Sequence, residues 1–250
     1  MKLAAVQYRP PKGDPELARS ELVDWLGQAG SMGADLVVCP EMATTGYVWP
    51  NAKSLRAHAE PAAGPTYQAL APMARKWGTW IVVGFVEQVG SDLYNSALVI
   101  DGEGELAGVY RKVLLYDLDK AWAVPGLERW VRETPLGRLA CGICMDLNDP
   151  GFITHLMRDE VDVLAFCTNW LEQGIDVLEY WNWQLGPYSG WFVAANSWGP
   201  DGDISFCGRS VILDPQGRPR AMAEQEGNQV LCVDTGAPCP APRSRLDNPG

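Results

Sequence analysis

Residues 137–148 join an apolar run to a polar turn in the order Gly137-Arg138-Leu139-Ala140-Cys141-Gly142-Ile143-Cys144-Met145-Asp146-Leu147-Asn148. The run from Leu139 to Ile143 has the length and residue types of a buried strand. Cys144 stands where this run ends, and Asp149-Pro150-Gly151 opens a predicted helix over residues 152–158. A thiol between a strand end and a helix start can have a lowered pKa and a reactive sulfur. Cys144 is therefore a candidate nucleophile, although most free cysteines are buried and inert.

The composition of the chain is that of one compact domain. It has 250 residues, of which 47% are hydrophobic and 20% are charged, and this is enough for a sizeable core. We therefore predict a single domain over residues 1–250, with an irregular, proline-rich tail from about residue 235. The formal net charge of -11 disfavours nucleic acid and anionic membranes as partners.

The first residues and the cysteines indicate a compartment. Residues 1–8 form too short an apolar run for a signal peptide, because Arg9-Pro10-Pro11 interrupts it. No apolar run approaches the roughly 20 residues that span a bilayer, so no membrane segment is predicted. The seven cysteines are an odd number scattered over predicted strands, which favours reduced thiols over a disulfide framework. These features predict a cytoplasmic protein.

Strands and helices alternate early in the chain, and strands follow one another later. Helices are predicted over residues 14–29, 66–77, 152–158 and 176–188, with Pro72 expected to interrupt or kink the second. Strands are predicted over residues 2–8, 35–39, 80–88, 93–100, 106–111, 130–134, 138–143, 161–166, 190–196, 205–213, 219–224 and 228–233. The three consecutive strands between residues 80 and 111 are expected to be antiparallel neighbours. This order favours an α/β fold of two sheets packed face to face with helices outside, rather than one doubly wound parallel sheet.

Three chemically complementary residues each come directly after a predicted apolar strand: Glu41, Lys112 and Cys144. Such strand ends can meet at one edge of the fold. The carboxylate can take the thiol proton, and the ammonium can stabilise the thiolate and the oxyanion formed after attack. The backbone N–H of Met145, one residue beyond the nucleophile, is a candidate second oxyanion donor. Taken singly, Glu41 and Lys112 have a simpler explanation as solvated loop charges.

The segments around these residues resemble, in the same order, those of the nitrilase, or carbon–nitrogen hydrolase, superfamily. At the three candidates they are Cys39-Pro40-Glu41-Met42 with Thr44-Thr45-Gly46-Tyr47, then Tyr110-Arg111-Lys112, then Cys144-Met145-Asp146-Leu147. The later ones are Thr168-Asn169-Trp170, Ala194-Ala195-Asn196, and Gly208-Arg209-Ser210 with Asp214-Pro215-Gln216-Gly217. The resemblance runs from Met1 to about Asp234.

This resemblance implies a four-layer α-β-β-α sandwich and a cysteine-dependent amidase without metal or organic cofactor. Glu41 would act as general base, Lys112 as oxyanion stabiliser, and Cys144 as the nucleophile that forms a thioester when ammonia or an amine leaves. Asp119 is a weaker candidate for the acidic residue that often supports such sites. Further candidates for supporting the site or binding substrate are Tyr47, Asn169 and Trp170. A homodimer that pairs through its helices is also implied.

Within the superfamily, the segments around Lys112 and Cys144 resemble protein N-terminal asparagine/glutamine amidohydrolases. Such enzymes remove the side-chain amide of a first residue, so their site must also hold an α-ammonium. The sequence leaves open which acidic residue would do this, and the candidates are Asp117, Asp119, Asp149 and Glu172.

Two departures leave the substrate open. The chain has Trp183-Gln184-Leu185-Gly186-Pro187 where superfamily members commonly carry arginine, and it lacks the long C-terminal extension of eukaryotic amidohydrolases. The second candidate function is therefore a small-molecule amidase, an ω-amidase or a carbamoyl-type metabolite hydrolase. The third is a non-catalytic binding protein on the same scaffold.

Other uses of the cysteines and aromatic residues fit the sequence less well. The Cys141-x-x-Cys144 spacing lacks the second cysteine or histidine pair of a structural zinc site. Strand alternation predicts these two side chains on opposite faces, which disfavours a redox dithiol. A cysteine–histidine hydrolase would require His58 or His155 beside Cys144. The tryptophans between residues 180 and 198 are expected in the core or a subunit interface, whereas Trp170 follows a strand end and could line the site.

Overall fold

Two six-stranded sheets make up most of this computed structural model, which describes residues 1–236. From edge to edge, the first sheet contains β14 (Gln229–Asp234), β1 (Lys2–Gln7), β2 (Leu36–Val38), β3 (Trp80–Val89), β4 (Asp92–Ile100) and β5 (Leu106–Arg111). Strands β1, β2 and β3 are parallel, and β3, β4 and β5 are antiparallel. The antiparallel order predicted for the three strands between residues 80 and 111 is therefore confirmed.

The second sheet contains β13 (Pro219–Met222), β12 (Val211–Leu213), β9 (Trp191–Asn196), β8 (Val163–Thr168), β7 (Gly137–Ile143) and β6 (Val131–Thr134). Its central strands β7, β8 and β9 are parallel, and antiparallel strands flank them. Protein covers both faces of these central strands, and β8 is buried along its whole length. This burial explains why its sequence is apolar without alternation.

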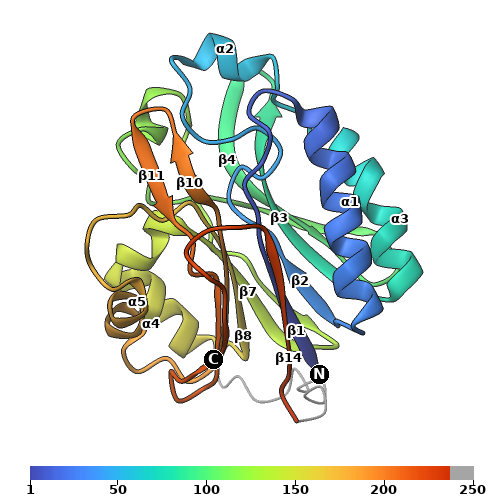
Figure 1. Ribbon diagram of the computed structural model, residues 1–250, viewed down its shortest axis with the longest axis vertical. Coiled ribbons are helices and arrows are strands. Elements are labelled where there is room, and N and C mark those ends of the chain that lie inside the picture. Colours follow the sequence, from blue (N-terminus) through green and yellow to red (C-terminus); the bar gives the residue numbers. More distant parts are fainter. Residues whose placement is uncertain (237–250) are drawn as a thin grey trace, which may run out of the picture.

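Helices cover the outer face of each sheet and complete four layers (Figure 1). The helices are α1 (Pro15–Ser31), α2 (Ala52–Arg56), α3 (Pro65–Trp77), α4 (Pro150–Arg158) and α5 (Val177–Leu185). Helices α1 and α3 pack on the first sheet, α4 and α5 pack on the second, and the short α2 lies at one end of the molecule. Cys141 and Ile143 of β7 point into the core between the sheets, whereas Ala140 points outward. The predicted α-β-β-α sandwich is confirmed.

Aspartate side chains cap three of these helices. Asp14 accepts a hydrogen bond from the N–H of Leu17, Asp149 caps α4, and Asp176 caps α5. Proline follows Asp14 and Asp149, where its missing N–H leaves no helical hydrogen bond unmade. These local signals fix where α4 and α5 begin, and both helices border the end of β7.

The structure differs from the sequence-based prediction in the segment from 205 to 213. One strand was expected there, but the chain forms β11 (Ile204–Cys207) and β12, which belong to different sheets. Gly208 and Arg209 both have positive φ, 63° and 56°, and this turns the chain between them. Strand β11 pairs with β10 (Trp198–Asp201), a strand that the sequence pattern did not predict, as it did not predict α2.

Pro72 is expected to interrupt or kink its helix, and α3 continues through it without an interruption. Pro72 is exposed. The carbonyl of Gln68, which has no N–H partner at Pro72, can therefore bond to water instead of being left unpaired in the core.

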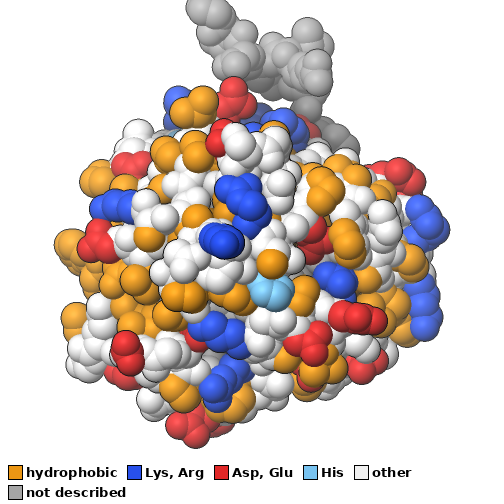
Figure 2. All heavy atoms as spheres, turned by 90° about the horizontal axis from the view of Figure 1, so that it is seen from above, with side chains coloured by type: hydrophobic (Ala, Val, Ile, Leu, Met, Phe, Trp, Pro, Cys, Tyr) orange, Lys and Arg blue, Asp and Glu red, His pale blue; other side chains and the backbone are white. Residues whose placement is uncertain are grey.

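The ends and the surface of the chain bear on the remaining predictions. The tail predicted from about residue 235 begins where β14 ends, and its residues 237–250 lie outside the described part. Within residues 1–236, no helix combines the length and apolar character needed to cross a membrane. The face of the molecule near α2 carries basic, acidic and hydrophobic side chains intermixed, and neither the basic nor the acidic ones gather in one patch there (Figure 2).

Candidate active site

Glu41 lies just beyond β2, on a loop that runs against β3. The N–H of Ala43 donates to the carbonyl oxygen of Gly84 in β3 over 2.9 Å. A Cβ at Gly84 would lie 2.4 Å from the carbonyl oxygen of Pro40 and 2.5 Å from the Cα of Glu41, so only glycine allows this close approach. The β3 backbone therefore supports the main chain of Glu41 directly.

The buried Glu41 carboxylate is held by donors from three separate segments. Its Oε1 accepts from Nδ2 of Asn95 at 2.7 Å and from Nζ of Lys112 at 2.8 Å. Its Oε2 accepts from the backbone N–H of Asn169 at 2.9 Å, and the Asn169 side chain donates to the Glu41 carbonyl oxygen. Because β4, the residue after β5 and the end of β8 all contribute, the carboxylate is fixed across both sheets.

Lys112 follows β5 and is completely buried. Besides Glu41, its ammonium bonds to Oδ2 of Asp119 at 2.6 Å. Asp119, also buried, opens the 3-10 helix η1 (Asp119–Ala121) and accepts from the Tyr47 hydroxyl at 3.0 Å and the Tyr116 N–H at 3.0 Å. Asp119 is therefore a second buried anion that orients Lys112.

Cys144 begins the 3-10 helix η2 (Cys144–Asn148) directly after β7, with a backbone φ of 43°. This left-handed conformation is uncommon for a residue other than glycine and turns the chain sharply. Cys144 packs against the inter-sheet core that contains Cys141. The prediction that these two side chains face opposite ways is wrong, because strand alternation ends at Ile143.

Asp146 joins this turn to the segment after Lys112, a role that the sequence analysis did not find. Its Oδ1 accepts from the N–H groups of Val113 and Leu114, at 3.1 and 2.9 Å. Its Oδ2 accepts from the Tyr110 hydroxyl at 2.7 Å and from the N–H of Ile143 at 3.0 Å. Arg129 neutralises this fully buried carboxylate at 3.0 Å. One side chain thus fixes the Cys144 turn relative to Lys112.

The charges in the site determine where its protons reside. Burial raises the pKa of the Glu41 carboxyl, Lys112 opposes this effect and Asp119 adds to it. Burial alone would lower the pKa of Lys112, but the carboxylates of Glu41 and Asp119 raise it well above its usual value. Burial raises the pKa of Cys144 to about 12, Glu41 adds to this rise and Lys112 only partly offsets it.

The lowered thiol pKa expected for Cys144 is therefore wrong. Burial and the neighbouring Glu41 carboxylate both disfavour the thiolate. Their effect on the pKa of Cys144 is larger than the opposing effect of the Lys112 charge and of the strand end. At neutral pH the resting sulfur carries its proton, so a base must remove it when the sulfur attacks.

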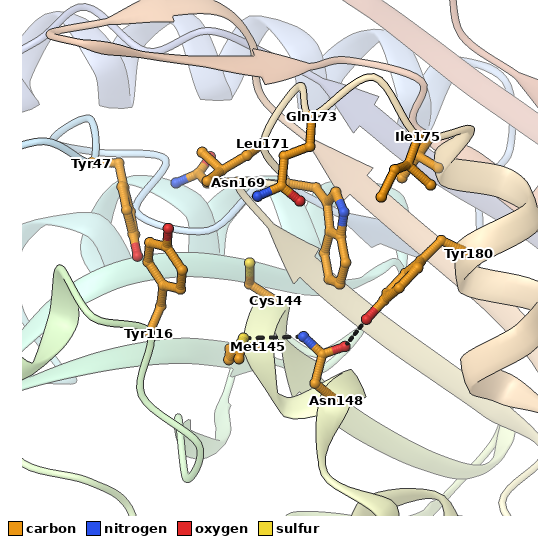
Figure 3. Close-up of a pocket in the computed structure, with 12 residues that line it drawn as sticks. Tyr47, Tyr116, Cys144, Met145, Asn148, Asn169, Leu171, Gln173, Ile175 and Tyr180 are labelled. Atoms are coloured by element: carbon orange, nitrogen blue, oxygen red, sulfur yellow. Dashed lines mark hydrogen bonds between the residues drawn. The ribbon is translucent and has the colours of Figure 1, made fainter.

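A pocket of about 370 Å³ opens beside Cys144. The sulfur points into it between Tyr116 on one side and Tyr180 on the other (Figure 3), and Trp170 also lines the pocket. The remaining predicted residues that line the pocket are Tyr47, Met145 and Asn169. Asn148, which was not singled out from the sequence, lies below the sulfur and hydrogen-bonds to Tyr180.

The four acidic residues considered for an α-ammonium lie outside this pocket lining as far as the described residues show. Asp119 is buried among its own donors. Asp117 is exposed and pairs with Lys120. Asp149 caps α4 and pairs with Arg129. The exposed Glu172 accepts from the Gly174 N–H and from the Gln225 side chain.

Neither histidine lines the pocket within the described residues. His58 packs against Trp49, and His155 is on α4 beside Asp159. Over residues 1–236, no three His, Cys, Asp or Glu side chains gather as a metal site would require. Among the tryptophans, Trp181 is fully buried and Trp183 is 73% exposed.

Asn95 was also missed, although a signal for it exists. It is a polar residue near the middle of β4, which continues into the apolar run Ala97 to Ile100, and it proves to be fully buried. A buried polar side chain needs a partner, and Asn95 finds Glu41 and Asp119.

Comparison with known proteins establishes the family. Residues 2–236 match the family described as carbon-nitrogen hydrolase. The chain belongs to this family. The carbon-nitrogen hydrolase described here is therefore an amidohydrolase that acts on carbon–nitrogen bonds other than peptide bonds.

Individual relatives of this carbon-nitrogen hydrolase include two amidases. The protein N-terminal amidase of Schizosaccharomyces pombe is 28% identical, over 87% of this chain and 93% of that protein. The 2-oxoglutaramate amidase of Bacillus subtilis is 32% identical, over 78% of this chain and 76% of that protein. A solved structure of the amidase from Nesterenkonia sp. AN1 has a TM-score of 0.81 at 24% identity, covering 94% of this chain and 92% of that one. This last likeness concerns the fold.

Proposed function

We propose that the protein hydrolyses a primary amide through Glu41, Lys112 and Cys144 and releases ammonia. The observation that carries this proposal is the buried Lys112 ammonium, which is held by Glu41 at 2.8 Å and Asp119 at 2.6 Å next to the pocket thiol. Two of its three N–H donors are used in these ion pairs, which leaves one for a substrate oxygen. A base, an oxyanion donor and a nucleophile are thus available together.

In the first half of the reaction, Glu41 takes the thiol proton while the sulfur of Cys144 attacks the amide carbon. The carbonyl oxygen becomes an oxyanion, which Lys112 and the Met145 N–H stabilise. Collapse of this intermediate breaks the C–N bond, and the proton held by Glu41 passes to the leaving nitrogen. Ammonia departs, and the acyl group stays on Cys144 as a thioester.

Water then completes the cycle. Glu41, again a carboxylate, takes a proton from a water molecule that attacks the thioester carbon. Lys112 and the Met145 N–H stabilise the second oxyanion, the C–S bond breaks, and the sulfur recovers the proton from Glu41. The products are the carboxylic acid and the free thiol, so the cycle needs no oxidant, reductant or cofactor.

Two substrate classes are supported by separate observations. The side-chain amide of an N-terminal Asn or Gln is supported by the 28% identity to a protein N-terminal amidase. A small free amide, as in an ω-amidase, is supported by the 32% identity to a 2-oxoglutaramate amidase.

We also propose a cytoplasmic homodimer. The outer helices carry exposed apolar side chains, with Met157 of α4 47% exposed and Trp183 of α5 73% exposed, and these suit pairing of two sandwiches through this layer. The six cysteines in the described residues are all free, which suits a reducing compartment.

The first experiment measures ammonia release from an Asn-initiated peptide, from the same peptide acetylated at its N-terminus, and from a small free amide. The Cys144→Ala variant should lose turnover of every one of them while keeping its fold. The matched control is Cys232→Ala, which removes a partly exposed thiol of β14 and should leave the rate unchanged. Retained activity in Cys144→Ala would disprove the mechanism. Release from the free peptide alone would assign N-terminal Asn as substrate.

A further inference from the structure

The pocket beside Cys144 carries no formal charge on its walls. Besides Cys144, its lining has four aromatic side chains, four aliphatic or thioether side chains and three amides within the described part of the chain. The charged groups of the candidate site are buried, and Glu41 and Asp119 each pair with Lys112. A charged group on the acyl part of a substrate would therefore lose water without gaining an ionic partner.

One wall of the pocket is a fixed aromatic surface. The rings of Trp170 and Tyr180 have centroids 5.5 Å apart, and Trp170 packs edge-on against the buried Trp181 at 5.7 Å. The Trp170 backbone N–H donates to Oδ1 of Asn196, which fixes this residue at the end of β8. Such a wall favours an apolar or aromatic group, and a volume of about 370 Å³ accommodates a small-molecule substrate.

The Asn148 amide supplies a neutral polar contact in a defined orientation. Its Oδ1 accepts from the Tyr180 hydroxyl and from the Gln184 amide, both at 2.8 Å. Its NH₂ group consequently faces away from them, toward the sulfur of Met145 at 3.1 Å (Figure 3). A thioether sulfur is a weak acceptor, so this NH₂ can still donate to an oxygen of a ligand.

On the basis of the proposed amidase function, we propose that the substrate is an uncharged primary amide, which selects the small free amide and disfavours an N-terminal Asn or Gln with its α-ammonium. Its acyl group carries an apolar or aromatic body, which lies against Trp170 and Tyr180, and an oxygen that accepts from Asn148. The identity of the wall residues, rather than of the reacting groups, selects this class.

The test compares four primary amides by ammonia release. Three have similar length but different charge: 4-oxopentanamide is neutral, 4-aminobutanamide is a cation and succinamate is an anion. The fourth, 3-phenylpropanamide, is neutral and aromatic. The expected kcat/KM of each neutral amide exceeds that of both charged amides by about 10-fold or more. Equal or faster turnover of either charged amide overturns the inference and leaves the proposed function intact.

A charge placed in the pocket sharpens the comparison. Ile175 lines the pocket and is 61% exposed, so Ile175→Glu can be tolerated by the fold. It should raise the ratio of 4-aminobutanamide to succinamate turnover by about 10-fold. The matched control is Leu17→Glu on the exposed side of α1, which adds the same charge and should leave this ratio unchanged. An unchanged ratio in Ile175→Glu overturns the inference, and so does ammonia release from the Asn-initiated peptide but from none of the four amides. No ammonia from the peptide or from any of the four amides overturns the proposed function itself.

Discussion

The two sides of the candidate site are built differently. Glu41, Lys112 and Asp119 are fully buried, and each is held by several charge-assisted hydrogen bonds. The pocket wall that includes Trp170 and Tyr180 is uncharged. The first arrangement leaves little freedom to any of its members, whereas substitutions can change the shape and polarity of the wall without disturbing the buried charges.

This difference separates two tasks. Groups that stabilise charge during a reaction gain most from being preorganised and shielded from water. Groups that select a substrate need only complementary shape and polarity. We therefore expect substitutions among the buried charges to change mainly kcat, and substitutions in the wall to change mainly KM.

The largest effect is expected for Lys112→Met. Loss of a main oxyanion stabiliser typically lowers kcat by about 10²–10³, and the uncharged side chain also leaves Glu41 and Asp119 without their shared cation. Steady-state kinetics on a neutral amide measures this, with circular dichroism to verify the fold.

The same substitution at Lys120 provides the control, because this side chain is 62% exposed and pairs only with the exposed Asp117 in the described contacts. Lys120→Met should have wild-type kinetics. If Lys112→Met also retained the wild-type kcat, Lys112 would have no part in the reaction. The buried ion pairs of Lys112 with Glu41 and Asp119 would then have only a structural role.

The next largest effect is expected for Asp146→Asn. An amide NH₂ would face donors that the carboxylate now accepts, such as the N–H groups of Val113 and Leu114. Leaving buried donors unsatisfied costs about 1–3 kcal/mol of stability. Because the Cys144 turn also loses its link to the segment after Lys112, kcat should fall with little change in KM.

Urea denaturation and kinetics measured together distinguish positioning from plain destabilisation. Asp214→Asn is the control, since Asp214 is also a buried carboxylate but holds the turn before β13 through Arg218 and the Gln216 N–H. It should lose stability without losing kcat. If Asp146→Asn behaved in the same way, its role would be structural only.

The sequence was sufficient to predict the features that depend on local pattern. The order of strands and helices predicted two sheets packed face to face with helices outside, and the family resemblance implied the four-layer sandwich. The residues after three strands gave Glu41, Lys112 and Cys144, which the structure brings to one edge. The catalytic roles of these three remain a prediction. Trp170 lines the pocket for the same reason, because it follows β8 by two residues.

The features that failed depend on distant contacts. The pKa of Cys144 is set by its burial and by the charges of Glu41 and Lys112, which the residues next to it in the sequence do not reveal. The partners of Asp146 come from β5, the segment after it and Arg129, so no local spacing indicates them. Residues 205–213 have the pattern of one strand, but positive φ at Gly208 and Arg209 divides them between two sheets.

The pH dependence tests the buried side without any substitution. Glu41 must be ionised to act as base, and its pKa is raised by burial, so kcat/KM should fall about tenfold per pH unit below a midpoint that lies above 4.5. The pKa of Lys112 is raised well above 10.5 and that of Cys144 to about 12, so neither should cause a loss of rate up to pH 9. A profile on an uncharged amide, with the fold monitored at each pH, measures both limits. A midpoint at or below pH 4.5, or a decline between pH 8 and 9, would contradict this account.

The smallest effect is expected for Tyr180→Phe in the pocket wall. The substitution keeps the ring against Trp170 but removes the hydroxyl that donates to Asn148 at 2.8 Å. One hydrogen bond contributes about 0.5–1.5 kcal/mol, so KM for a neutral amide should rise about 2- to 12-fold while kcat stays unchanged. Tyr67→Phe on α3 removes a hydroxyl bonded to the Gly104 carbonyl, outside the pocket, and should change neither constant. If Tyr180→Phe lowered kcat and left KM unchanged, the pocket wall would take part in the chemical step. The expectation that the wall affects mainly KM and the buried charges mainly kcat would then be wrong.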